Sequence, residues 1–213
     1  MSIAAIPGIS GIQQAAIATA FAAAGWTTRG ISRSPGAGHL VADLETGAGL
    51  AEAFRGADVV AFTLPQDYRP GAKARIARTI AQAAADAGVG RIVLNTAARL
   101  QRGQTAAIFA DMAEAVDLVK SGPVPAVVLE PTVFMDNLLA PWSLPGIQAG
   151  TLAYPATEAT RIAWMSHRTL AQAMVAAATA DVAGQEIAIG GPQALSGTDL
   201  TATLAAHLGR PIG

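Results

Sequence analysis

Short apolar runs of strand length alternate with longer, alanine-rich stretches of helical length along most of this chain. The alternation is typical of βαβ units, in which helices cover both faces of a parallel sheet. Strands buried on both faces read as nearly continuous apolar runs, as residues 58–64 and 91–96 do. The pattern therefore predicts an α/β fold built on a parallel sheet.

The expected elements follow from these runs and from the Gly and Pro residues that end them. Strands are expected at residues 2–6, 27–32, 40–42, 58–64, 91–96, 126–129 and 186–189. Helices are expected at residues 11–24, 49–55, 70–87, 104–120, 169–179 and 197–208, with an irregular segment at 141–150. This order predicts a doubly wound, Rossmann-type sheet in one domain over residues 1–213, with 131–213 as a small C-terminal region on the substrate side.

Composition excludes several classes of partner. A net charge of −1 with scattered basic residues disfavours nucleic acid and membrane surfaces. The absence of cysteine excludes disulfides, thiolate zinc sites and cysteine nucleophiles, and we predict no metal site. The apolar first 24 residues lack Lys and Arg and are broken by Pro7 and Gly8, so we expect a first strand and helix rather than a signal peptide. We therefore expect a cytoplasmic protein.

A glycine-containing turn joins the first expected strand to the first expected helix. Gly8, Ser10, Gly11 and Ile12 occupy the place where a Gly-rich turn directs helix N–H groups toward a pyrophosphate. Gln14 stands where a third glycine is expected, and its side chain would obstruct close approach. The turn is therefore either a weakened phosphate site or an ordinary strand–helix connection.

Two charged residues follow the second and third strands. Arg33 stands where a basic residue would meet the 2′-phosphate of NADP, whereas an acidic residue would bind the ribose hydroxyls of NAD. The alternative is a solvated loop arginine. Asp43 either meets the adenine amino group or caps the turn at Thr46. Arg33 makes NADP the predicted cofactor.

Several motifs together resemble one known family. They include Gly8-x-x-Gly11, the segments 32–35 and 91–94, and above all residues 131–139, Pro-Thr-Val-Phe-Met-Asp-Asn-Leu-Leu. The chain resembles, over nearly its whole length, the NmrA-like family of atypical short-chain dehydrogenase/reductases. It departs from the family pattern at Glu130, where an Arg is frequent, and at Pro7, where a Thr is frequent.

The resemblance implies NADP bound along the strand ends. It places Thr63, Leu64 and Pro65 beside the nicotinamide ribose, and it places the side chains of 134, 135 and 137 near the substrate. Relatives continue with helices that cover the cleft, so we expect here either an open cleft or one closed by the second subunit of a homodimer.

The Tyr–Lys pair that supplies the proton in typical short-chain dehydrogenases is absent. Those enzymes use a Tyr and a Lys four residues later, but the lysines here are Lys73 and Lys120, preceded at that spacing by Arg69 and Val116. Losing positioned acid catalysis costs roughly 10²–10⁴-fold in rate. Reduction of an ordinary ketone is therefore disfavoured, while a quinone, an enone, a redox-neutral reaction or no reaction remains open.

The polar catalytic candidates are His167, Tyr154 and Asn137. Histidine is suited to acid–base work near neutral pH, but His167 also fits the surface turn that begins a helix, and Tyr154 also fits a structural role. Asn95 and Thr96 end a strand where ligands of such sheets bind, or they form a hydrogen-bonded loop start. Three apolar side chains are expected to line one substrate pocket, namely those of Phe134, Met135 and Trp164.

These observations predict an NADPH-dependent oxidoreductase acting on a small, flat acceptor such as a quinone or enone. Two alternatives remain. One is a non-catalytic NADP-sensing module, and the other is a cofactor-independent isomerase, lyase or hydrolase that uses Glu130, Asp136 or His167.

Overall fold

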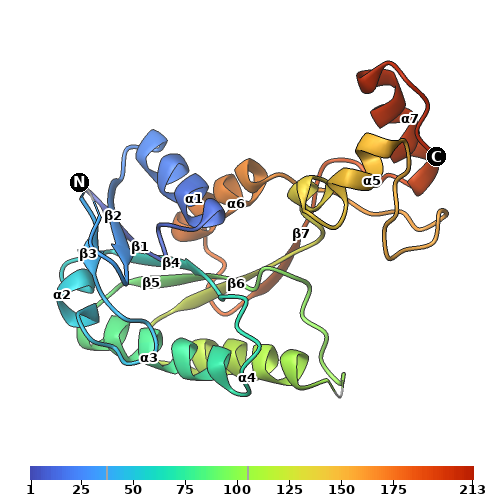
Figure 1. The fold of residues 1–213 in the computed structure, drawn as a ribbon. Helices are drawn as coiled ribbons and strands as arrows, with labels where there is room; N and C mark the ends of the chain where they lie inside the picture. The colour runs from blue at the N-terminus through green and yellow to red at the C-terminus, as the bar shows by residue number, and fades with distance from the viewer. Residues whose placement is uncertain (37, 105) are drawn as a thin grey trace.

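The computed structural model describes residues 1–36, 38–104 and 106–213, and seven strands of these residues form one parallel sheet (Figure 1). The strand order is β3-β2-β1-β4-β5-β6-β7. The strands are β1 (Ile3–Pro7), β2 (Thr27–Ser32), β3 (Leu40–Val41), β4 (Val59–Thr63), β5 (Arg91–Asn95), β6 (Ala126–Pro131) and β7 (Glu186–Ile189).

The sheet changes its winding direction between β1 and β4. From β1 the chain builds outward through β2 and β3, and it then returns to place β4 on the other side of β1. Ala4 pairs with Thr28 of β2 and with Val59 of β4, which fixes the register of this junction. The doubly wound parallel sheet is confirmed, and its ligand crevice is expected outside the carboxyl ends of β1 and β4.

Two helical layers cover the sheet. Helices α1 and α6 lie on one face, and α2, α3 and α4 lie on the other (Figure 1). Alternate residues of β4 supply both cores, because Phe62 packs under α3 and α4 while Ala61 packs under α1 and α6. The helices are α1 (Ile12–Ala23), α2 (Leu50–Phe54), α3 (Ala72–Asp86), α4 (Ala107–Ser121), α5 (Leu144–Ala149), α6 (His167–Thr179) and α7 (Gly197–Leu208).

Element bounds agree with the sequence prediction to within about three residues, with one correction. The segment 141–150, expected to be irregular, contains α5, which has a proline in its first turn and ends at Gly150 in a left-handed conformation (φ 95°). A 3₁₀ helix, η1 (Met135–Leu139), precedes it. One residue of the helix expected at 104–120, residue 105, lies outside the described residues.

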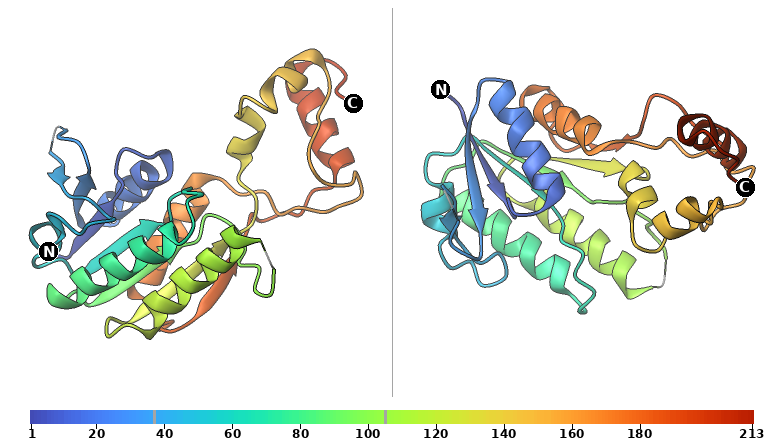
Figure 2. Two further views of the ribbon diagram at one scale, coloured as in Figure 1. Left: turned by 60° about the horizontal axis from the view of Figure 1, so that its bottom comes forward. Right: turned by 45° about the horizontal axis from the view of Figure 1, so that its top comes forward.

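The C-terminal lobe, which we define as residues 135–163 and 192–213, projects from one end of the sheet (Figure 2). It contains η1, α5 and α7. Three chain segments connect it to the sheet, and we call them the neck: residues 132–135, 163–165 and 189–191.

Backbone hydrogen bonds join all three segments of the neck. Thr132 N–H donates to Ile189 O (2.9 Å), Met165 N–H to Val133 O (2.9 Å), and Gly191 N–H to Ala163 O (3.2 Å). A Cβ at Gly191 would overlap the carbonyl oxygen of Trp164, so this crossing requires glycine.

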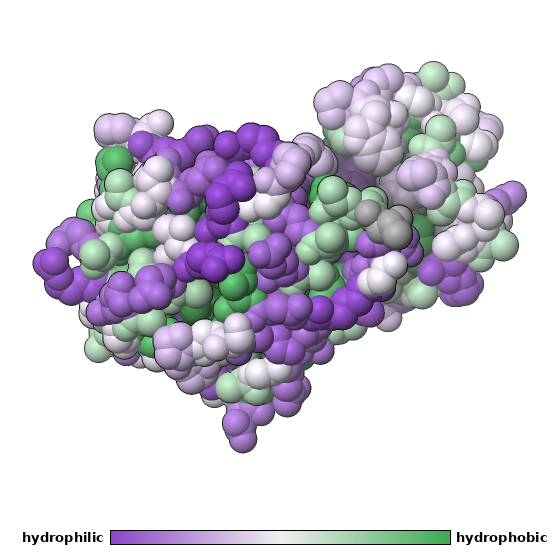
Figure 3. Space-filling model, turned by 90° about the horizontal axis from the view of Figure 1, so that it is seen from below, coloured by the Kyte–Doolittle hydropathy of each residue, from purple (hydrophilic) through white to green (hydrophobic). Residues whose placement is uncertain are grey.

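Hydrophilic side chains cover much of the face formed by α3 and α4, with smaller hydrophobic patches between them (Figure 3). None of the helices within the described residues is long and apolar enough to cross a membrane. No group of three or more possible metal ligands gathers among those residues.

Candidate functional site

A cavity of about 560 Å³ lies at the carboxyl ends of β1, β2 and β4, and we call it the sheet-edge cavity. It collects residues from four separate loops. Five of the predicted cofactor residues line it, namely Gly8, Ser10, Arg33, Asp43 and Pro65. The volume is within the range of small-molecule sites, and the position is the expected crevice.

Several N–H groups of the glycine turn already have partners, either in β2 or in the turn itself. Gly8 and Ile9 donate to Ile31 O (2.8 and 3.0 Å), and Gly11 donates to Gly8 O (2.9 Å). Gly8 adopts φ 79°, which favours glycine. Gly11 is the N-cap of α1 and supplies no side-chain cap, so the first N–H groups of this helix, that of Ile12 included, remain available to an anion.

Gln14 lies directly against this turn. Its side chain is 7% exposed. Its Cγ would lie 3.7 Å from a Cβ on Gly8, and its Oε1 would lie 3.5 Å from a Cβ on Gly11. The Gln14 side chain therefore fills the space beside both glycines and packs against the turn.

Asp43 caps the turn that follows β3. Its Oδ1 accepts hydrogen bonds from the Thr46 N–H (2.7 Å), the Glu45 N–H (2.9 Å) and the Thr46 hydroxyl (3.0 Å). The Thr46 backbone bond is the main cause that holds the pKa of Asp43 below its ordinary value, and the charge of Arg33 contributes. The structure shows the turn cap, made by Oδ1, and the contact of Asp43 with the adenine amino group stays a prediction.

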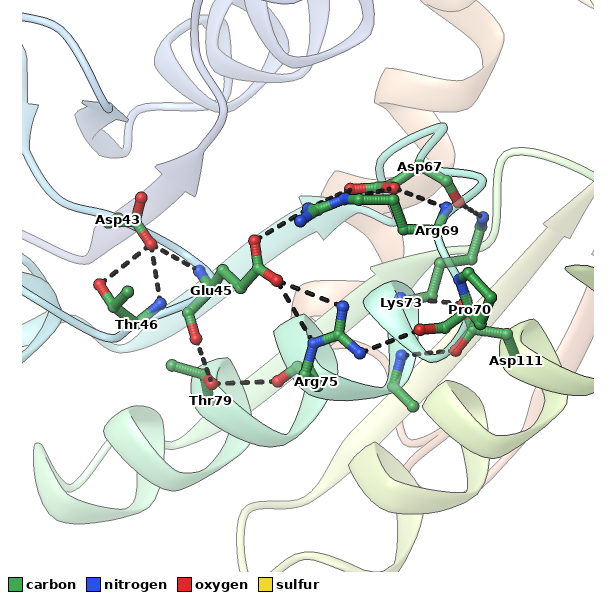
Figure 4. A network of polar contacts seen from close by, with 11 residues as sticks. Asp43, Glu45, Thr46, Asp67, Arg69, Pro70, Lys73, Arg75, Thr79 and Asp111 are labelled. Carbon is green, nitrogen blue, oxygen red and sulfur yellow. Dashed lines mark hydrogen bonds and ion pairs between the residues drawn. The ribbon is translucent and has the colours of Figure 1, made fainter.

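An ion network that the sequence did not reveal borders the sheet-edge cavity (Figure 4). Arg69 joins Glu45 (2.9 Å) to Asp67 (2.6 Å), and Arg75 contacts Glu45 at 3.3 Å. The hydrogen bond from Arg69 lowers the pKa of Asp67 to about 2 and also lowers that of Glu45. Glu45 precedes α2 and Arg69 precedes α3, so the network ties together two loops that line the cavity.

The ends of β4 and β5 form a second polar cluster. Asn95, which is fully buried, donates from Nδ2 to Thr63 Oγ1 and to Gln13 Oε1, both at 3.0 Å. Its Oδ1 accepts from the N–H of Ala97, which adopts a left-handed φ of 64°. Asn95 thus links two strands with the first turn of α1.

Two other predicted cofactor residues at these strand ends turn inward. Leu64 is 1% exposed, and its N–H donates to Asn95 O (2.9 Å). The Thr96 hydroxyl lies 2.5 Å from Ala98 O and 3.2 Å from Leu129 O. Their side chains therefore support the loop rather than face the cavity.

The three predicted catalytic residues gather around η1. Asn137 Nδ2 donates to the Tyr154 hydroxyl (3.1 Å), and Asp136 Oδ1 lies 3.4 Å from His167 Nδ1. His167 is the first residue of α6, and its ring centroid lies 5.0 Å from that of Phe134. The structure therefore provides two polar pairs on consecutive residues of η1.

The prediction that Phe134, Met135 and Trp164 line one pocket is wrong. Trp164 lines a second cavity, of about 450 Å³, inside the C-terminal lobe, and neither Phe134 nor Met135 reaches it. Phe134 pairs with Met165 and packs with it in the core beneath α6. Successive side chains of an extended segment point to opposite sides, so Trp164 faces away from Phe134.

Both lysines have structural partners. Lys73 donates from Nζ to Asp67 O, and Lys120 contacts Glu186, both at 2.6 Å. Asp111, on α4, accepts the N–H of Lys73 and that of Ala74, both at 3.0 Å. This carboxylate caps the N-terminus of α3 across the interface between two helices.

Comparison with solved structures supports the fold. A nucleoside-diphosphate-sugar epimerase from Staphylococcus aureus is 21% identical, with a TM-score of 0.81 over 100% of this chain and 78% of its own. Triphenylmethane reductase from Citrobacter sp., complexed with NADP(H), is 15% identical, with a TM-score of 0.78 over 100% and 78%. A short-chain dehydrogenase/reductase superfamily protein from Agrobacterium tumefaciens with bound NAD is 18% identical, with a TM-score of 0.76 over 99% and 84%.

No curated protein sequence matches the chain. A family model, described as the NmrA-like family, matches residues 2–212, nearly the whole sequence. The glycine turn, the doubly wound sheet and residues 131–139 all lie within the matched region. The chain therefore belongs to the NmrA-like family.

Proposed function

We propose that this protein is an NADPH-dependent oxidoreductase that reduces a small, flat acceptor such as a quinone or enone. The observation that carries the proposal is the meeting of the glycine turn and Arg33 in one cavity at the winding change of the sheet. This cavity would hold the adenosine half of the cofactor, with the 2′-phosphate beside Arg33 and the pyrophosphate at the N-terminus of α1. NADPH, when bound, supplies the hydride.

The residues present fit such a cofactor. The first N–H groups of α1 have no intrahelical partner, and an anion placed there is stabilised by the helix dipole. Ser10 and Ser32 also line the cavity. From this cavity the remaining half of the cofactor would follow the strand ends past Thr63 and Asn95. Other structures of this fold are complexed with NAD or with NADP(H), in agreement with either nicotinamide dinucleotide.

The acid that replaces the missing Tyr–Lys pair is assigned to Tyr154 or to His167. Because Asn137 donates to the Tyr154 oxygen, the hydroxyl hydrogen of Tyr154 is directed elsewhere and can be donated to an acceptor. His167, held by Asp136, would donate only in its protonated form. An easily reduced acceptor needs less acid assistance than a ketone, which is why quinones and enones are the favoured class.

The proposal is tested by calorimetric titration of NADPH and NADH, followed by NADPH consumption with quinones and enones. We expect NADPH to bind more tightly than NADH, and Arg33→Ala to remove most of the difference, about 10- to 100-fold, because a hydrogen bond to a charged group contributes about 1.5–3 kcal/mol. Arg55→Ala, which removes an exposed arginine outside the cavity, serves as the control. Equal affinities in the wild type would contradict the NADPH assignment. Binding without turnover would favour the sensing module, and no binding of either cofactor would favour the cofactor-independent enzyme.

A further inference from the structure

The cavity inside the C-terminal lobe, the lobe cavity, has an apolar floor and an aromatic wall. It measures about 450 Å³, a size suited to a small organic ligand. Its floor includes the buried side chains of Leu200 and Ile212. Its wall is formed by Tyr154 and Trp164, whose ring centroids lie 4.9 Å apart at 64°. Such edge-to-face rings form a stable surface on which a flat ring can pack.

The wall is also connected to the ends of the sheet strands. The Tyr154 hydroxyl accepts a hydrogen bond from Asn137 on η1, the helix that follows β6. Trp164 belongs to the neck and is followed directly by Met165, which packs in the core beneath α6. A ligand against this wall is therefore held by residues that are anchored to the sheet.

The charges of the lobe cavity disfavour an anionic ligand. Among the residues that line it, Glu158 is the one with a charged side chain. The nearby Arg161 donates to Ala194 O (2.6 Å) and lies 3.4 Å from Asp199, neither of which lines the cavity. Arg210 donates to two carbonyl oxygens of α5. Among the described residues that line the lobe cavity there is thus no arginine, lysine or histidine to meet a diphosphate.

The N-terminus of α7, which also borders the lobe cavity, does not supply an anion site. The Asp199 carboxylate accepts the N–H of Ser196 (2.9 Å), and the Asp199 N–H donates to the Ser196 hydroxyl (3.1 Å), which closes a capping box. The Gly197 N–H donates to Glu158 O (2.8 Å). The N–H groups of Gly197 and Asp199 are therefore already used, and a carboxylate already occupies the positive end of the helix dipole.

We propose that the lobe cavity binds a flat aromatic molecule that is neutral or positively charged, and that this molecule is the acceptor of the reaction. The second half of this inference rests on the proposed function, whereas the first half does not. An aromatic wall together with one carboxylate attracts a cationic ring through its π face and its charge. A sugar nucleotide, which carries a diphosphate, is disfavoured by the same charges.

Three probes of similar size and different charge test the inference in the absence of cofactor: N-methylquinolinium, naphthalene and 2-naphthoate. Binding is measured by calorimetry, together with quenching of tryptophan fluorescence. We expect the cation to bind most tightly and the anion to bind most weakly. If the anion binds as tightly as the cation, or if no probe binds, the inference is overturned.

Variants assign the binding to the lobe cavity. Glu158 is exposed, so Glu158→Gln should leave the fold intact. It should weaken the cation by about two- to fivefold and leave naphthalene unchanged, as expected for an exposed charge. Asp181→Asn, which alters an exposed carboxylate outside the cavity, should change nothing. Trp164→Phe should weaken all three probes, and unchanged binding in both cavity variants would place the probes elsewhere and refute the inference.

A separate titration with NADPH distinguishes the two proposals. If the probes bind as expected but NADPH does not, the oxidoreductase function fails and the ligand site stands. If NADPH binds and the probes fail, the lobe cavity is not a ligand site and the acceptor must bind at the strand ends.

Discussion

Asp67, which is half-buried, connects two loops beside the sheet-edge cavity. Its carboxylate receives the Arg69 side chain and also the Arg69 N–H (2.9 Å), so both the charge and the loop conformation depend on it. Its pKa falls from 3.8 to about 2, mainly through the side-chain hydrogen bond from Arg69. The neighbouring Glu45 extends the same arrangement to the loop before α2.

We predict that Asp67→Asn reduces stability near neutral pH but not in strong acid. A carboxylate with a lowered folded-state pKa contributes stability above its ordinary value of 3.8, and the contribution is lost as pH falls toward about 2. Urea unfolding of both proteins at about pH 5 and about pH 2.5 should show the difference in free energy of unfolding shrinking at the lower pH. A difference of constant size at both pH values, or the same behaviour in Asp181→Asn, would show that the ion pair is not its source.

Gln14 gives a second prediction at this scale. Replacing it by glycine removes the side chain that lies against Gly8 and Gly11, and it should let the turn approach the pyrophosphate more closely. We expect tighter NADPH binding together with a loss of stability, of which about 1 kcal/mol comes from glycine's low helix propensity and the rest from the missing buried side chain. Calorimetric titration and thermal unfolding measure the two effects. Ala22→Gly, at an exposed position of the same helix, should reproduce the propensity part of this loss but not the gain in affinity.

Among the helices, α3 depends on a cap supplied by a neighbouring element. Its N-cap, Gly71, has no side chain, and Asp111 of α4 accepts the N–H groups of Lys73 and Ala74 instead. Asp111 is 7% exposed, so water cannot readily replace it. The cap fixes α3 against α4 at the end of the helix nearest to the ion network.

We predict that Asp111→Ala lowers the free energy of unfolding by about 2–4 kcal/mol, because two buried N–H groups lose their partner. Asp111→Asn keeps one acceptor oxygen and should cost about half as much. Asp117→Ala on the same helix removes an exposed ion pair with Arg102 and should cost under about 1 kcal/mol. Urea unfolding measures all three, and equal losses for Asp111 and Asp117 would rule out the capping role.

The strands and helices could be predicted from the sequence, but some contacts between them could not. The strands and helices were predictable because the period of the apolar residues is local, as in the buried run of β4 and the helical face of α3. The cap by Asp111 was not, since its partners are 37 and 38 residues away and carry no side-chain signal. Arg33 and Gly8 meet as expected because the ends of parallel strands share one edge of the sheet.

The error at Phe134 and Trp164 has the same origin. Both lie in the Pro- and Gly-containing part of the chain, where no periodicity indicates which side chains face each other. The pairing of Phe134 with Met165 decides the orientation, and a shift of one residue reverses it.

On the scale of the whole molecule, stability should be unevenly distributed between the sheet and the C-terminal lobe. Eight residues of helix α3 are buried, whereas α7 buries Leu200. Local opening is easiest where few apolar contacts are lost. We predict that the amides of α7 exchange with solvent deuterium faster than those of α3, β4 and the neck, as measured by mass spectrometry of peptic fragments. Equal protection in α7 and α3 would mean that the lobe unfolds only with the whole protein.

The neck has a consequence for reactivity. A lid on a single flexible connection can bring two reactants together by closing, but three hydrogen-bonded chain segments resist such swinging. Under the proposed function, the neck then fixes the distance between the bound hydride donor and the acceptor. Reaction rates should therefore depend steeply on acceptor size. Gly191 holds that distance, because any Cβ at this position would overlap the carbonyl oxygen of Trp164.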